Sequence, residues 1–156
     1  MTAGEPPQTA LRLTFAYSGD SIRLAASRAV DMRVPPSDPV DGYQGQTGFW
    51  AELRDSTGTT IYRLVMHNPI PSYHEVHAPP GTSPTHTPVR NREGTFEIVL
   101  PTPPPGSTVV LFGTPHPPST PIGEFAEERA RTGGPRVGTG PASEIARFGM
   151  DEVRPA

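Results

Sequence analysis

Apolar and polar residues alternate along several short stretches of the chain, and most prolines lie between these stretches. Every second residue from position 11 to position 17 is apolar, which is the period-2 pattern of a half-buried β-strand. The alternation resumes at 21–34, after the turn-forming residues 18–20, and together these segments predict a β-hairpin. Because the second stretch is longer than an ordinary strand, we expect a bend or bulge near 26–28, where a chain can change sheets.

The middle of the chain predicts a second hairpin. Residues 49–54 and 61–66 are rich in apolar side chains. The connection 55–58 begins with aspartate and ends with glycine, which fits a type I turn followed by a left-handed position. We expect a short extended piece at 73–77, followed by a proline-containing loop at 79–93.

Two more strands are expected at 96–100 and 109–112. The second of these is continuously apolar, which indicates a strand that is covered on both faces and lies inside its sheet. Further on, a threonine-proline pair, early glutamates, late arginines and a closing glycine pair predict a short helix at 121–131. The last apolar run, 144–150, fits either an edge strand or a helical turn, and we favour the strand.

These elements predict an all-β protein. The expected architecture is a two-layer antiparallel β-sandwich of seven to eight strands, immunoglobulin-like in outline, with one short C-terminal helix. We assign 1–9 to a flexible lead, 10–113 to the sandwich core and 114–156 to a proline- and glycine-rich extension. Antibody domains combine a cysteine pair with a tryptophan, and this chain has no cysteine. A shared architecture in any case implies no function.

Composition and charge exclude some function classes. The 156 residues suit one domain, and the 22 prolines and 16 glycines account for much of the low apolar fraction of 33%. The formal net charge of −3 argues against binding to a nucleic-acid backbone. All 13 basic residues are arginine, which favours planar, bidentate pairing.

Targeting signals are also missing from this sequence. The first residues have neither a basic region nor an apolar one, and no apolar run approaches the roughly 18 residues of a membrane-spanning helix. We therefore expect a cytoplasmic protein without membrane insertion, unless it is exported without a cleavable signal. With no cysteine, disulfides and thiolate metal sites are excluded.

Candidate chemistry is weak along the whole chain. His74 and His77 are three residues apart, one short of the spacing that lets two histidines share a helix face in a zinc site, and in a strand they point to opposite sides. Asp38, Asp41 and Asp55, with a glutamate at 93, suggest calcium only weakly, since aspartate is common in turns. No nucleophile motif is present. We expect neither catalysis nor a cofactor.

The aromatic residues predict an interaction surface instead. If the odd-numbered residues of 49–54 face the core, the only tryptophan lies on the outer face. In 61–66, two apolar sets compete for the interior, so one is left over. An apolar surplus is covered either by the C-terminal segment or by another chain. The interface candidates are Trp50, Arg54, Tyr62, Met66, Tyr43 and Phe125.

We therefore expect a non-catalytic protein-interaction or structural module that binds a protein partner or self-associates. Two alternatives stay open. One is a carbohydrate-binding module in which Tyr43, Trp50 and Tyr73 stack on sugars. The other is a metal-dependent enzyme built on His74 and His77.

Overall fold

The computed structural model describes residues 9–71, 73–76, 80–81, 85–88, 92–114 and 141–151, with 73–76 and 85–88 described by their backbone. These residues form nine β-strands and no helix. In chain order the strands are β1 (Thr9–Ser18), β2 (Ser21–Asp31), β3 (Phe49–Arg54), β4 (Thr60–Met66), β5 (Tyr73–Val76), β6 (Thr85–Pro88), β7 (Glu93–Pro101), β8 (Thr108–Gly113) and β9 (Ser143–Gly149).

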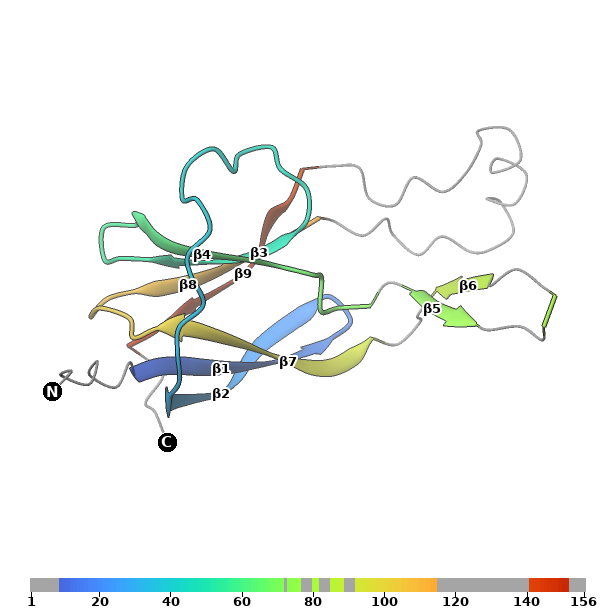
Figure 1. Ribbon diagram of the computed structural model, residues 1–156, viewed down its shortest axis with the longest axis horizontal. Coiled ribbons are helices and arrows are strands. Elements are labelled where there is room, and N and C mark those ends of the chain that lie inside the picture. The colour runs from blue at the N-terminus through green and yellow to red at the C-terminus, as the bar shows by residue number, and fades with distance from the viewer. Residues whose placement is uncertain are drawn as a thin grey trace, which may run out of the picture.

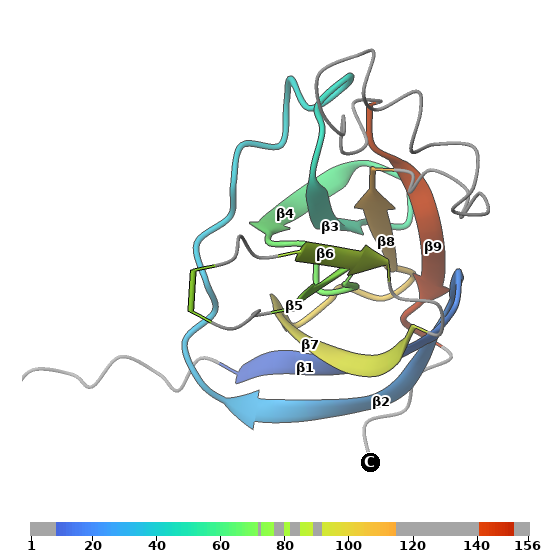
Figure 2. The same ribbon diagram turned by 90° about the vertical axis from the view of Figure 1, so that its right-hand side faces the viewer.

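Seven of the strands form two facing antiparallel sheets (Figure 1). One sheet has the order β2-β1-β7 and the other the order β4-β3-β8-β9. Figure 2 shows the two layers from the side. The strands β5 and β6 pair with each other and project beyond the two layers (Figure 1). The prediction of an all-β protein with two antiparallel sheets is confirmed.

A single apolar core fills the space between the sheets. Phe15 of β1 lies in it with its ring centroid 5.2 Å from the rings of both Phe96 and Phe148, so it joins β7 of its own sheet to β9 of the other. Alternate residues of the strands supply the rest, because successive side chains point to opposite faces. Further buried members are Leu13, Ile98, Leu100, Phe49, Ala51, Leu53, Tyr62, Val109, Leu111 and Met150.

The hairpin between β3 and β4 has the predicted turn. The amide of Gly58 donates to the carbonyl of Asp55, and Gly58 has a φ of 84°, as expected for a type I turn that ends in a left-handed position. The continuously apolar run in β8 is also confirmed as an interior strand, since β8 lies between β3 and β9 and Val110 on its outer side is fully buried.

The long second strand has the expected irregularity. It falls at Ala25, because Thr14 pairs with Ala26 while Phe15 pairs with Leu24, and this extra residue is next to the segment 26–28 near which a bulge was predicted. The chain does not change sheets there, however, since β2 stays paired with β1 up to Asp31.

Of the remaining predicted elements, some are confirmed, one is wrong in part and some lie outside the described residues. The last apolar run is a strand, β9, as favoured, and the extended piece at 73–77 corresponds to β5. The loop expected at 79–93 is wrong in part, because it contains β6; threonine, histidine and proline there show no apolar alternation. The predicted helix at 121–131 lies outside the described residues. So does the predicted lead at 1–9, except for Thr9, which begins β1.

The immunoglobulin-like part of the prediction is not confirmed. In an immunoglobulin domain the first strand lies at a sheet edge beside the second. Here the first strand, β1, lies in the middle of the three-stranded sheet, between β2 and β7. Alternation of apolar residues cannot distinguish these two orders, because both bury the same faces.

Ser27 on β2 gives a first testable prediction. It is 7% exposed, and its Oγ is the one buried side-chain N or O atom without a hydrogen-bond partner within the described part of the chain. Ser27→Ala should raise the free energy of unfolding by about 1 kcal/mol, because an unpaired hydroxyl no longer has to leave water. Urea denaturation measures this as a higher midpoint at constant slope.

The matched control is Ser107→Ala. Ser107 is also buried, at 2% exposure, but its hydroxyl donates to the carbonyl of Pro104 at 2.6 Å. This variant should lose about 1 kcal/mol, since it leaves a hydrogen bond unmade. If both substitutions destabilise equally, the hydroxyl of Ser27 has a partner and the assignment is wrong.

Candidate functional site on the outer face of the four-stranded sheet

The even-numbered residues of β3 lie on the outer face of their sheet, as the alternation predicted. Trp50 is nevertheless only 3% exposed. Its indole stacks on the ring of Phe112 from β8, with centroids 5.3 Å apart, and the ring of Tyr43 meets it edge-on at 5.2 Å. The outer face of this sheet therefore has a small interior of its own.

Glu52 is at the centre of this second interior. Four side chains donate six hydrogen bonds to its carboxylate, three to each oxygen. Arg63 Nη2 lies 2.6 Å from Oε1 and Arg54 Nη2 lies 2.7 Å from Oε2. The remaining donors include the indole of Trp50 and the hydroxyl of Thr60. A buried carboxylate is stable only when it is paired in this way.

Arg63 links this cluster to the segment between β2 and β3. Figure 1 shows that segment leaving the lower sheet, passing β4 and arching above the upper sheet. The guanidinium of Arg63 donates to the carbonyl of Pro39 and lies over the ring of Tyr43 with its Cζ 4.3 Å from the centroid. Tyr43 in turn covers Trp50. The loop is thus held on the sheet by a hydrogen bond from a charged guanidinium and by a cation–π contact.

The same loop also closes the free edge of β4. The amide of Asp38 donates to the carbonyl of Arg63, and the amide of Arg63 donates to Ser37 Oγ. The amide of Val65 donates to Asp38 Oδ2 at 2.7 Å. Edge strands with open amides and carbonyls invite pairing with other chains, and the loop occupies these groups.

The cluster is not suited to proton transfer. Burial is the largest effect on the pKa of Glu52 and raises it, but the hydrogen bonds from Arg63, Arg54 and Trp50 together outweigh burial, so the pKa lies below the ordinary value of 4.5. A general base needs a pKa near the working pH and an open oxygen. Glu52 has neither.

We found no match for the chain among protein families, curated proteins or solved structures.

The structure brings together only part of the predicted interface set. Trp50, Arg54 and Tyr43 meet on the outer face, but Trp50 is covered by the chain's own loop. Neither the C-terminal segment nor another chain is needed to cover the indole. We expected either the C-terminal segment or another chain to cover this face, and the ring that meets the indole here is that of Tyr43 in the loop between β2 and β3. Phe125 lies outside the described residues.

Tyr62 and Met66 point the other way. Tyr62 is a buried member of the core, with its hydroxyl donating to the carbonyl of Pro35 at 2.8 Å, and Met66 packs against the same core. The apolar set left outside is Ile61 and Val65, which are 43% and 39% exposed. Either apolar set of β4 could have faced the core, and the set with the longer side chains, which includes Tyr62 and Met66, does so.

The alternative chemistries gain no support from this geometry. A sugar cannot stack on Trp50 while Tyr43 and Phe112 cover it. In the ranges that the structure describes, no group of three or more histidine, cysteine or acidic residues could hold a metal ion. Asp38 and Asp55, considered for calcium, instead accept backbone amides, Asp55 from Thr57 and Thr59. Among the described elements there is no helix that could span a membrane.

The low pKa of Glu52 gives a prediction about pH. A carboxyl group whose pKa is lower in the folded than in the unfolded protein stabilises the folded state at pH values above its unfolded pKa. This stabilisation is lost as the pH falls through the folded pKa. The free energy of unfolding should therefore be level at neutral pH and fall below about pH 4.5. Carbon NMR of the Glu52 carboxyl should show a titration midpoint below 4.5. A midpoint above that value would contradict the six-donor arrangement.

Proposed function

We propose that this chain is a non-catalytic interaction module that binds another protein through an aliphatic strip beside β4. The strip consists of Ile61, Val65 and Val40. The observation that carries the proposal is their exposure: they are three of the five large apolar residues that lie exposed within the described ranges, at 43%, 39% and 38%. Exposed aliphatic groups that gather in one place are typical of protein contact sites.

Hydrogen bonds support the grouping of these three residues. Asp38 bonds to the amide of Val65, and Pro39 bonds to the guanidinium of Arg63, so the loop brings Val40, the next residue, to the outer side of β4. Ile61 and Val65 have the same parity as Arg63 and share its outer face. The strip therefore combines one loop residue with two strand residues.

The closed edge indicates how a partner would bind. The loop already occupies the outward amides of Arg63 and Val65 and the carbonyl of Arg63. Addition of a strand from another chain to this edge is therefore disfavoured. Recognition would use side-chain surface, supported by a sheet that the Glu52 cluster keeps rigid.

Site-specific crosslinking tests this proposal. A photo-crosslinking amino acid would replace Ile61 or Val65 in the native host, and Met32 or Ile145 as matched controls, since these two are 39% and 38% exposed elsewhere. We expect the same discrete adduct from positions 61 and 65, none from 32 or 145, and loss of the adduct when excess unlabelled chain competes. The same adduct pattern from all four positions, or none from any, would contradict the proposal.

A further inference from the structure

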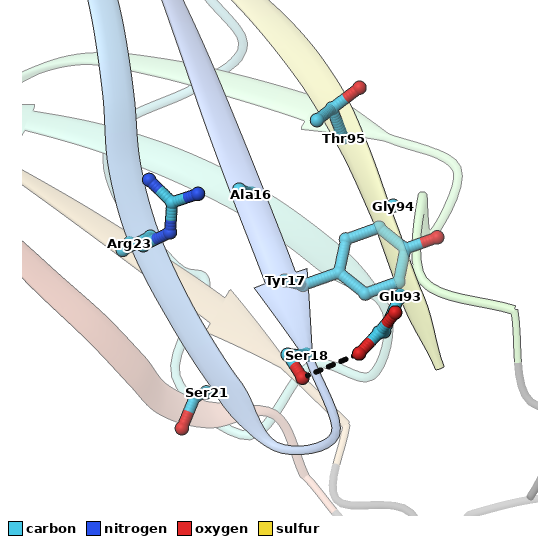
Figure 3. A pocket seen from close by; sticks show the side chains of 8 residues that line it. All are labelled: Ala16, Tyr17, Ser18, Ser21, Arg23, Glu93, Gly94 and Thr95. Atoms are coloured by element: carbon cyan, nitrogen blue, oxygen red, sulfur yellow. Dashed lines mark hydrogen bonds between the residues drawn. The ribbon is translucent and has the colours of Figure 1, made fainter. Parts of the chain in front are cut away.

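A hollow lies on the outer face of the other sheet, at its β1–β2 turn. It has a volume of about 420 Å³ and is lined by residues of β1, β2 and β7 (Figure 3). The pairing of the strands arranges its side chains in two neighbouring rows. The lining side chains are Arg23, Ala16 and Thr95 in one row and Ser21, Ser18 and Glu93 in the next.

The hollow forms because the middle side chain of the first row is short. Ala16 lies between Arg23 and Thr95, and neighbouring strands are roughly 4.8 Å apart, so the two longer side chains stand on either side of a methyl group. Tyr17 and Gly94 complete the lining. A Cβ on Gly94 would lie 2.5 Å from the Tyr17 hydroxyl, which shows how closely the tyrosine packs against β7.

The polar groups around the hollow differ in whether they already have a hydrogen-bond partner. Ser18 Oγ donates to Glu93 Oε1 at 3.4 Å, as Figure 3 shows. The guanidinium of Arg23 has no ion-pair or hydrogen-bond partner among the side chains that the structure describes. Arginine presents several donors in one plane, which match the two oxygens of a carboxylate. The hydroxyls of Ser21 and Thr95 are further donors beside it.

We propose that this hollow binds a carboxylate group, with Arg23 as its charge partner. Glu93 lies in the opposite corner, in the other row and two strands away. It repels a second negative charge and can accept a hydrogen bond from a hydroxyl or ammonium group of the ligand. The site therefore selects monocarboxylates that also carry a donor, either as free small molecules or as the end of a peptide chain. This inference is independent of the strip on β4.

An NMR titration of the amide resonances tests the proposal. The probes are lactate, malonate, and a triglycine peptide with a free or an amidated C-terminus, all at constant ionic strength. We expect saturable shifts at the amides of Ala16, Arg23 and Thr95 with lactate or the free peptide, in the millimolar range, and weaker binding of malonate. Whichever of lactate and free peptide binds more tightly identifies the source of the carboxylate.

Two variants decide whether Arg23 is responsible. Arg23→Gln should weaken binding by about tenfold or more, as the loss of a charged hydrogen bond implies. Arg28→Gln is the matched control, since Arg28 lies on the same strand and also pairs with a residue of β1, and it should leave binding unchanged. Equal effects of the two variants, equal binding of the amidated peptide, or shifts no larger than those with chloride would overturn the proposal.

Discussion

Glu52→Leu is expected to lower the free energy of unfolding by about 3–5 kcal/mol, because it leaves the buried charge of Arg63 without a partner. Arg63 is 4% exposed and cannot reach water without releasing the carbonyl of Pro39 and the ring of Tyr43. Arg54 is less affected, since 24% of its side chain is exposed. Urea denaturation monitored by the single tryptophan measures the loss.

Two further variants separate this effect from a general one. The double variant Glu52→Leu with Arg63→Met should recover much of the lost stability, because replacing both members of a buried pair is far less costly than breaking it. Glu144→Leu removes the carboxylate of the ion pair between Glu144 and Arg147, whose side chains are 40% and 51% exposed. It should change stability by less than about 1 kcal/mol. A double variant no more stable than Glu52→Leu alone would contradict the account of the cluster.

Phe15→Ala should also cost about 3–5 kcal/mol, the usual range for a buried phenylalanine. Phe15 is fully buried and touches aromatic rings from both sheets, so the surrounding side chains cannot close the cavity without shifting a strand. The control is Phe112→Ala, a half-buried ring on the outer face, which should cost less. Thermal and urea unfolding of the two variants measure the difference, and an equal loss would place the main core elsewhere.

Much of the fold followed from periodicity alone. The alternation in β1, β3 and β7 and the continuous apolar run in β8 are set by which faces are buried, and the turn at 55–58 is set by its aspartate and glycine. The short β6 has no such pattern, and the hairpin that it forms with β5 lies outside the two layers (Figure 1). The order of β1 and β2 in their sheet depends on contacts that alternation does not record.

The outer-face site was predictable in part. Parity placed Trp50 and Arg54 correctly. Glu52 lies directly opposite Arg63, a pair of unlike charges across the hairpin, but a regular pairing from the turn at 55–58 would place Glu52 opposite Ile61. The register shift between Leu53 and Arg54 produces the observed pair, and alternation does not predict such a shift. The cover over Trp50 could not be read from the sequence in this way, since it depends on how the irregular loop that carries Tyr43 folds back over the sheet.

The most direct test uses the one tryptophan of the chain. Trp50 is covered by the chain's own loop, while the aliphatic strip on β4 stays exposed. Acrylamide quenching of the tryptophan fluorescence should be weak in the native protein and should rise clearly in Tyr43→Ala, while Ile61→Ser leaves it unchanged. A native indole that is quenched as readily as in the unfolded chain, or one indifferent to the loss of Tyr43, would contradict the account.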